Sequence, residues 1–258
     1  MEGELATLRY DEIGFWSEVK LDILREYASA YSRILSSQKN ASLYHIYIDA
    51  FAGAGKHISK HTGDFIPGSP ANALLINPPF REYHLIDLDA QKIDALEQLS
   101  GERDDVFIYR GDCNEILLNK VFHRARYKDF RRALCILDPY GLHLDWEIMH
   151  TAGTMKSIEI FLNFPVADMN RNVLWHSPEG VSSDQIERMN KFWGDESWKK
   201  AAYKESPQRP LWGESKLVKT TNDQVVKAFQ QRLWIFDITA GRDRYLCQSS
   251  PWNAVGAL

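Results

Sequence analysis

Four acidic residues stand where apolar stretches of the sequence end, and together they can build a ligand site. They are Asp49, Asp87, Asp112 and Asp138. Carboxylates accept hydrogen bonds from hydroxyl and amino groups, so such residues can hold a sugar diol or a base. In open α/β sheets, ligands bind outside the carboxyl ends of the strands. The repetition therefore predicts one binding site along one edge of a parallel sheet.

A glycine-containing loop follows the first of these acidic residues, in the order Asp49-x-Phe51-x-Gly53-x-Gly55. Glycine at a strand-to-helix turn allows the backbone to approach a ligand closely. The alternative is a tight turn that binds nothing. The full dinucleotide fingerprint is absent, so a nicotinamide-dependent oxidoreductase is disfavoured.

The next two acidic residues each have a ligand-binding and a structural interpretation. Asp87 can accept two hydrogen bonds from a ribose diol, whereas its neighbour Asp89 is better suited to cap the following helix. Asp112 stands where it can meet an adenine amino group. It can equally cap a helix over 114–118, and both interpretations of Asp112 stay open.

The order of these motifs resembles the class I S-adenosylmethionine-dependent methyltransferases. The hydrophobic-D-x-F-x-G-x-G form is most similar to the branches that methylate amino groups and cytosines of nucleic acids. The resemblance implies that the cofactor S-adenosylmethionine is bound by the glycine loop and the next two acidic residues. Gly53 and Gly55 would adjoin the methionine part, Asp87 the ribose and Asp112 the adenine, with Asp49 and Phe51 in the same loop.

Longer stretches resemble a narrower family, the bacterial three-Cys-motif partner proteins, over about residues 15–232. They include YIDAFAGAGKHISK, GSPANALL, RALCILDPYGLHLDW, IEIFLNFPVADMNRNVLW and RMNKFWGDESW. The family name refers to a neighbouring gene product, a radical S-adenosylmethionine-like protein that carries the three cysteines. No activity is firmly established for the family, so this resemblance implies a fold and a possible protein partner.

The segment Asp138-Pro139-Tyr140-Gly141 is the candidate catalytic loop. The resemblance implies that Asp138 and a backbone carbonyl accept hydrogen bonds from a target amino group while Tyr140 stacks on a flipped base. The familiar pattern has two prolines before the aromatic residue, and this chain has one. A structural turn is therefore an equal alternative for this loop.

Three further groups of residues have a functional and a structural interpretation. Asn163, before Phe164-Pro165, could line the pocket or simply end a strand. Basic and aromatic residues between 124 and 132 could follow a phosphate backbone, but a solvated face is the commoner explanation. Trp193 and Trp198 are expected to pack a helical subdomain rather than to stack bases.

Hydrophobic periodicity predicts alternating strands and helices, which is typical of a doubly wound, mostly parallel, Rossmann-like sheet of the class I methyltransferase kind. We expect an N-terminal helical segment over 1–42, a cofactor-binding core over 43–165 and a Trp-rich helical elaboration over 166–234. The last segment, 235–258, lacks a clean hairpin pattern and is interpreted as an atypical, truncated tail.

Composition restricts the class of protein. The 258 residues are 44% hydrophobic and 26% charged, with a net charge of −4, which argues mildly against a protein that coats nucleic acid. The three cysteines form no metal-binding pattern, His57 and His61 have no acidic partner near them in sequence, and no metal is expected. The N-terminus does not resemble a secretory signal, and no apolar run is long enough to span a bilayer, so we expect a cytoplasmic protein.

Two functions follow as hypotheses. The first is a methyltransferase that acts on an amino group of a DNA or RNA base. The second is a non-catalytic accessory partner of the three-cysteine protein, with the same fold and the cofactor still bound. The intact glycine loop favours the first hypothesis, and the single proline and acidic charge favour the second.

Overall fold

The computed structural model describes residues 10–38, 43–206, 217–235 and 247–248. The chain divides into two compact units, which are described separately. The first unit comprises residues 1–137 and 157–160, and the second comprises residues 138–156 and 161–258. The domain boundaries expected from the sequence stay predictions, and most of the expected tail, 236–246 and 249–258, lies outside the described residues.

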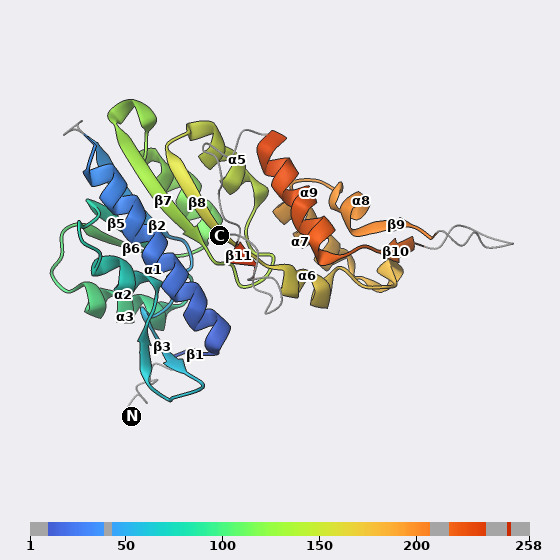
Figure 1. The fold of residues 1–258 in the computed structure, drawn as a ribbon, viewed down its shortest axis with the longest axis horizontal. Coiled ribbons are helices and arrows are strands. Elements are labelled where there is room, and N and C mark those ends of the chain that lie inside the picture. The colour runs from blue at the N-terminus through green and yellow to red at the C-terminus, as the bar shows by residue number, and fades with distance from the viewer. Residues whose placement is uncertain (1–9, 39–42, 207–216, 236–246, 249–258) are drawn as a thin grey trace, which may run out of the picture. The chain divides into compact units, whose positions relative to one another are not determined.

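A mainly parallel sheet organises the fold (Figure 1). Its strand order is β11-β8-β7-β2-β5-β6. The pairs β11/β8, β7/β2, β2/β5 and β5/β6 are all parallel. Strands β2, β5 and β7 are almost wholly buried, as expected for apolar strands with helices on the faces of the sheet. The strands are β2 (Tyr44–Asp49), β5 (Glu82–Asp87), β6 (Val106–Arg110), β7 (Arg131–Leu137), β8 (Ile158–Phe164) and β11 (Cys247–Gln248).

This strand order reverses direction at β2. From β2 the chain moves outward through β5 to β6, and it then returns to place β7 on the other side of β2. Ligands of open α/β sheets bind at the carboxyl ends of the strands where the order reverses in this way. The prediction of an α/β fold with a parallel sheet and flanking helices is therefore confirmed, and the reversal falls beside Asp49.

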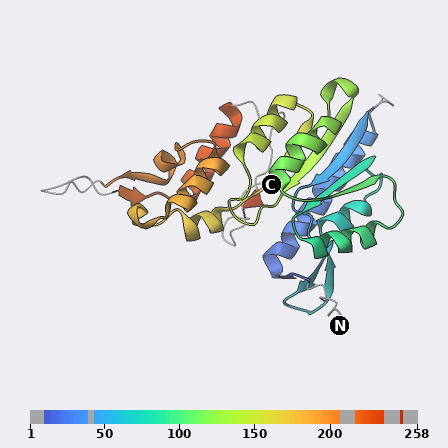
Figure 2. The same ribbon diagram turned by 180° about the vertical axis from the view of Figure 1, so that it is seen from behind.

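Helices of the first unit cover its part of the sheet. Helix α1 crosses in front of the strands in Figure 1 and packs against α2, whereas α3 packs against β5 and β6. Seen from behind in Figure 2, the helix formed by α4 and η1 lies in front of the strands. The helices are α1 (Phe15–Ser36), α2 (Ser69–Leu74), α3 (Ala90–Ser100), α4 (Cys113–Ile116), the π-helical η1 (Leu117–Val121) and the 3-10 turns η2 (Phe122–Arg124) and η3 (Tyr127–Asp129).

A small sheet extends from the first unit. Strand β1 (Glu12–Ile13) pairs in parallel with β3 (Lys56–Ser59), which forms an antiparallel hairpin with β4 (Phe65–Pro67). The sequence Gly68-Ser69-Pro70 predicts Ser69 as the N-cap of a helix over 71–76, but this prediction is wrong, because Gly68 is the N-cap and Ser69 lies inside α2. Gly68 N–H donates to the Gly55 carbonyl at 2.8 Å, so the start of α2 is fixed one residue earlier by the glycine loop.

The second unit is mainly helical, as its sequence predicts. Its core packs Phe192, Phe229 and Phe164 together, with the Phe192 and Phe229 ring centroids 5.4 Å apart. Trp193 and Trp198 are buried and donate to Ser197 and Asn190, so the expectation that they pack a helical subdomain is confirmed. The elements are α5 (Trp146–Met155), α6 (Val166–Asn172), η4 (Pro178–Gly180), α7 (Ser183–Trp193), α8 (Trp198–Ala202), β9 (Tyr203–Glu205), β10 (Leu217–Lys219) and α9 (Asn222–Ile235).

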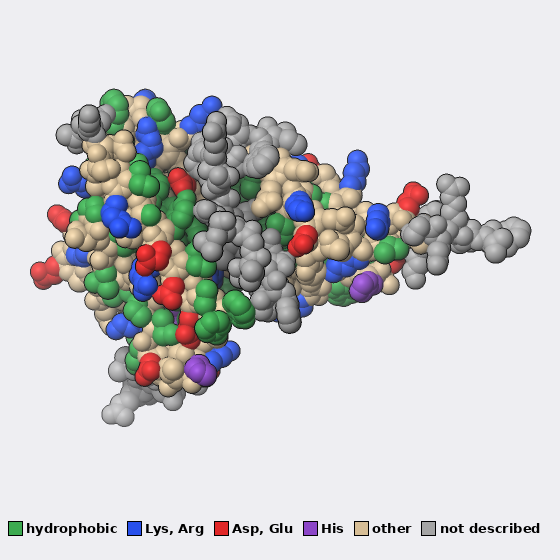
Figure 3. Space-filling model, in the orientation of Figure 1, with side chains coloured by type: hydrophobic (Ala, Val, Ile, Leu, Met, Phe, Trp, Pro, Cys, Tyr) green, Lys and Arg blue, Asp and Glu red, His purple; other side chains and the backbone are tan. Residues whose placement is uncertain are grey.

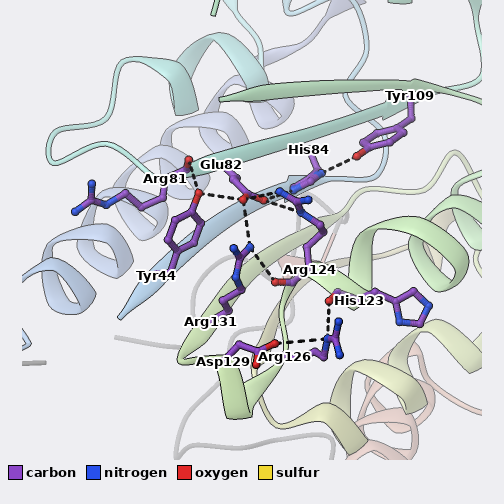
Figure 4. A network of polar contacts seen from close by, with 10 residues as sticks. All are labelled: Tyr44, Arg81, Glu82, His84, Tyr109, His123, Arg124, Arg126, Asp129 and Arg131. Carbon is purple, nitrogen blue, oxygen red and sulfur yellow. Dashed lines mark hydrogen bonds and ion pairs between the residues drawn. The ribbon is translucent and has the colours of Figure 1, made fainter. Parts of the chain in front are cut away.

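A buried carboxylate joins the amino ends of β2, β5 and β7 (Figure 4). Glu82 accepts two hydrogen bonds from Arg124, at 2.7 and 3.1 Å, and one from Arg131 at 3.2 Å. Tyr44 and His84 complete its shell at 3.0 and 3.1 Å. The two most central cations of the 124–132 segment therefore neutralise a buried charge and support the fold.

The remaining arginines of that segment are also engaged. Arg126 lies 3.6 Å from the Asp129 carboxylate, and the Arg132 guanidinium lies 3.7 Å from the centre of the Tyr127 ring. These contacts belong to the amino edge of the sheet, opposite the edge where ligands of such folds bind. The geometry favours the structural interpretation of the basic segment over a path for a phosphate backbone.

The contacts of Glu82 set its protonation state. Burial acts to raise the pKa of its carboxyl, but the hydrogen bonds from His84, Arg124 and Tyr44 outweigh burial and hold that pKa well below its ordinary value. Burial also lowers the pKa of His84, so the neutral ring donates from Nε2 to Glu82 and accepts at Nδ1 from the Tyr109 hydroxyl, 3.1 Å away.

Replacing Glu82 tests this network. We expect Glu82→Gln to lower the free energy of unfolding by about 3 kcal/mol at pH 7, since two arginines lose a buried partner. The carboxyl has a lower pKa in the folded chain than in the unfolded chain, so its contribution is complete above the unfolded value of about 4.3 and is lost as pH falls below it. Urea unfolding of both proteins at pH 7 and at pH 3.5 measures the difference.

The matched control is Asp105→Asn, which removes a partly exposed ion pair with Arg103. We expect it to cost less than about 1 kcal/mol. A Glu82→Gln effect that is equally large at both pH values contradicts the electrostatic explanation.

Candidate functional site

The loop after β2 is bound to both neighbouring strands. Ala50 N–H donates to the Ile136 carbonyl of β7 at 3.1 Å, and Ala52 N–H donates to the Ile86 carbonyl of β5 at 2.9 Å. The loop therefore crosses the carboxyl edge of the sheet at the reversal of strand order, where the sequence predicts the site.

Asp87 fixes the glycine of this loop. Its Oδ2 accepts the Gly53 N–H at 2.9 Å, and its Oδ1 accepts the Asp89 N–H at 2.9 Å. Each carboxylate oxygen has a second lone pair, so Asp87 keeps capacity to accept from a ligand. Asp89 caps α3 through the Gln91 N–H, as the sequence favours, and the ribose-binding role of Asp87 stays a prediction.

The two glycines of the loop differ in their surroundings. Both have left-handed backbones, with φ of 65° at Gly53 and 75° at Gly55. A Cβ at Gly53 would meet no atom within 4 Å although the residue is buried, so space remains beside the backbone there. A Cβ at Gly55 would lie 2.6 Å from Leu99 Cδ2 of α3, so Gly55 is needed for packing.

Asp49 organises the loop from within the protein. Its side chain has no exposed surface, and its Oδ1 accepts the Phe51 N–H at 3.3 Å. The Tyr47 hydroxyl lies 3.3 Å from Oδ2. Burial, and then the charge of Asp49, raise the pKa of Tyr47 and of the Cys135 thiol well above their ordinary values. Asp49 therefore stabilises the conformation of the loop. Phe51, two residues further along the chain, is only partly buried.

Asp112 lies at the adjoining strand end. Its Oδ1 accepts the backbone N–H groups of Asn114 and Glu115 at 2.9 and 3.2 Å, so it caps α4. Gly111 N–H donates to the Asp87 carbonyl at 3.0 Å, which brings the two strand ends together. Asp112 is exposed, so its contact with an adenine amino group stays a prediction beside its capping role.

Sequence analysis overlooked Leu88 at this edge. Its side chain is 72% exposed although it directly follows the buried strand β5 and Asp87. The exposed leucine adds an apolar surface beside the Asp87 carboxylate. The signal was present in the sequence as a large apolar residue between two acidic ones.

The loop Asp138-Pro139-Tyr140-Gly141 opens the second unit. Asn163, near the end of β8, donates from Nδ2 to Asp138 Oδ1 at 2.6 Å. Gly141 has φ of 79°, and a Cβ there would lie 2.8 Å from Asp168 Oδ2 of α6. The loop therefore packs closely against α6, while Tyr140 is 63% exposed.

Other ligand classes find little support in the part of the chain that the structure describes. No cluster of histidine, cysteine and acidic residues there could hold a metal ion. Cys113 and Cys135 are buried free thiols, as expected from their apolar surroundings. None of the helices in this part combines the length and apolar character needed to cross a bilayer.

Figure 3 shows one face of the molecule. Lysine and arginine side chains are interspersed there with acidic and hydrophobic ones, and the described residues of this face form no broad basic surface. A nucleic-acid ligand on this face would find no continuous path of positive charge, in keeping with the net charge of −4.

Comparisons with known proteins give only distant likenesses. No protein-family model matches the chain, and no curated protein matches its sequence. A solved structure with some similarity is the crystal structure of protein LPL1258 from Legionella pneumophila str. Philadelphia 1, family-model DUF519, which is 12% identical over 84% of this chain and 93% of that chain with a TM-score of 0.41. A TM-score this low carries no argument about fold or function.

The two loop glycines should respond differently to alanine. We expect Gly53→Ala to lower the free energy of unfolding by about 1–2 kcal/mol, the cost of a left-handed alanine. Gly55→Ala should cost about 1 kcal/mol more, because Leu99 must also move. Thermal unfolding of the two variants measures the difference, and equal destabilisation would show that Leu99 does not confine Gly55.

Proposed function

We propose that the chain is an S-adenosylmethionine-dependent methyltransferase that acts on an amino group of a nucleic-acid base. The observation that carries the proposal is the Asp87–Gly53 hydrogen bond at the reversal of strand order, beside a backbone with space next to it. Membership of the class I methyltransferases, and of the three-Cys-motif partner family within them, is part of the same proposal.

The residues of the first unit fit the cofactor by their chemistry. Asp87 binds the ribose diol as a charged acceptor, Leu88 offers an apolar surface to the adenine, and the space beside Gly53 admits the amino-acid part. Asp112 retains Oδ2 to accept from the adenine amino group, since its capping bonds both use Oδ1. When bound, the cofactor supplies an activated methyl group on a sulfonium.

The acceptor of the methyl group is assigned to the loop that opens the second unit. Asp138 accepts a hydrogen bond from the target amino group and orients the nitrogen lone pair. Tyr140 is exposed, so its ring can stack on a base that has left its own stack. The chain needs no nucleophile of its own, because the target nitrogen is the nucleophile.

A second candidate function is the accessory subunit of a three-cysteine, radical S-adenosylmethionine-like protein. The observation that favours it is the engagement of Arg124 and Arg131 with Glu82, which leaves these cations committed to the fold. In that case the cofactor is bound but no methyl group is transferred, and the exposed aromatic residues contact a protein.

Cofactor binding is the first test. We expect calorimetry to show micromolar binding of S-adenosylmethionine and no comparable binding of NAD. Asp87→Ala should weaken binding at least about 10-fold, because charge-assisted hydrogen bonds worth about 1.5–3 kcal/mol are lost.

The matched control for this test is Asp89→Ala, which changes the carboxylate two residues further along the chain. It removes the cap of α3 and should lower stability by about 1 kcal/mol while affinity stays within about two-fold. Binding of NAD in place of S-adenosylmethionine would contradict the assignment of the site.

Methyl transfer is the second test. Labelled-methyl transfer is measured with DNA, tRNA and the three-cysteine protein as acceptors. We expect transfer to nucleic acid, and we expect Asp138→Ala to lower kcat about 100-fold with cofactor affinity unchanged, since it removes an acceptor that orients the target nitrogen.

The matched control for transfer is Asp184→Asn, an exposed carboxylate on α7, which should leave kcat unchanged. Good cofactor binding without transfer to any acceptor would reject the enzyme and support the accessory function. Full activity of the Asp138→Ala variant would show that Asp138 has no catalytic role.

A further inference from the structure

Asn163 and Asp138 form a polar pair at the ends of adjacent elements of the second unit. Asn163 is the residue before the last of β8, and Asp138 directly follows β7 in the chain. The Asn163 Nδ2 donates to Asp138 Oδ1 at 2.6 Å, which is short for a hydrogen bond between an amide and a carboxylate.

This hydrogen bond fixes the orientation of the Asn163 amide. A carboxylate has only acceptors, so the amide must turn its NH₂ group to Asp138 and its Oδ1 away from it. Asn163 is 8% exposed, and none of the residues that the structure describes places a hydrogen-bond donor within reach of its Oδ1. The pair therefore presents one buried acceptor that lacks a donor.

Buried acceptors without donors are rare, because each costs about 1–3 kcal/mol. Such an atom beside a carboxylate at the carboxyl end of a sheet is suited to a ligand that brings N–H groups. Asp138 has further acceptor capacity of its own, since a carboxylate can accept about four hydrogen bonds. The pair thus offers two neighbouring acceptors from two different side chains.

We propose that Asn163 Oδ1 and the Asp138 carboxylate together hold the two N–H groups of an unsubstituted exocyclic amino group. The inference rests on the proposed methyltransferase function and names the feature of the substrate that this site selects. An NH₂ group satisfies both acceptors at once, whereas a hydroxyl, a ring nitrogen or a carbonyl cannot.

This arrangement also orients the reacting nitrogen. With both N–H groups held in the plane of the base, the nitrogen lone pair is perpendicular to that plane. A bound cofactor would supply an activated methyl group to this nitrogen, and the cofactor sulfur would keep the electron pair of the bond that is lost. The nitrogen then carries one proton too many, and this proton passes to the Asp138 carboxylate.

The product of one transfer no longer fits the pair. A monomethylated amino group has one N–H, so it can satisfy only one of the two acceptors, and its methyl group crowds the other. We therefore expect the protein to methylate each amino group once and to discriminate against the monomethylated base.

The test compares paired single-stranded oligonucleotides with the full chain. One pair carries a single adenine or N6-methyladenine, and the other carries a single cytosine or N4-methylcytosine. For the base that accepts the methyl group, we expect kcat/KM to be at least about 30-fold higher for the unmethylated form. In Asn163→Leu this ratio should fall to within about three-fold of one, mainly through a lower kcat for the unmethylated base.

Two further variants complete the design. Asn172→Ala removes another partly buried asparagine, which donates to Asp168 at 2.8 Å, and should leave the ratio unchanged. Asn163→Ala removes the same acceptor with less added bulk and replaces Asn163→Leu if that variant fails to fold. Calorimetry with S-adenosylmethionine confirms that each variant binds cofactor, so a changed ratio reports on the acceptor pair rather than on folding.

The outcomes separate the two proposals. A wild-type protein that transfers methyl groups but keeps the same ratio after Asn163→Leu and Asn163→Ala overturns the role of Asn163 and leaves the methyltransferase standing. If the wild-type protein transfers no methyl group to either oligonucleotide pair, the methyltransferase proposal is wrong, and the proposed role of the acceptor pair is wrong as well.

Discussion

The hydrogen bond from Gly53 N–H to Asp87 Oδ2 is the contact on which the carboxyl edge of the sheet depends. It joins the loop after β2 to the end of β5, and the loop is fixed on its other side by the Ile136 carbonyl of β7. These three strands meet where the strand order reverses. The backbone is left-handed at Gly53 and lies beside the Asp87 carboxylate. The acceptors and the space next to them are therefore already in place before a ligand binds, which lowers the cost of binding.

The two edges of the sheet use polar residues in opposite ways. At the amino edge, Glu82 is surrounded by Arg124, Arg131, Tyr44 and His84, and all these groups satisfy one another. At the carboxyl edge, Asp87 and Asp112 use part of their acceptor capacity on the backbone and keep the rest. A network in which all donors and acceptors are paired stabilises the fold. Carboxylates that use only part of their acceptor capacity can also accept hydrogen bonds from a ligand.

Local patterns in the sequence predicted the elements that hold the site. The apolar periodicity of residues 15–36 predicts a helix, and α1 spans Phe15–Ser36; the apolar run over 158–164 predicts a strand, and β8 spans Ile158–Phe164. The pairing of Glu82 with arginines 42 and 49 residues further along the chain could not be predicted, since no local spacing encodes it. The Ser69 cap failed for a similar reason, because a long-range bond from Gly68 to Gly55 sets the start of α2. The separate roles of Gly53 and Gly55 also depend on Leu99, which the sequence places 44 residues beyond Gly55.

Asn163 illustrates how a strand-end asparagine gains a chemical meaning only in three dimensions. In the sequence it could line a pocket or end a strand, and nothing local decides between them. The carboxylate of Asp138 sets the direction of the amide, because it cannot donate, and the amide oxygen is then left without a donor among the described residues. A residue that only ends a strand does not require a buried acceptor without a donor. A residue that binds an N–H group of a ligand does require one in the free protein. The energetic cost of that atom in the free protein, about 1–3 kcal/mol, is the physical reason to assign it to a ligand rather than to the fold.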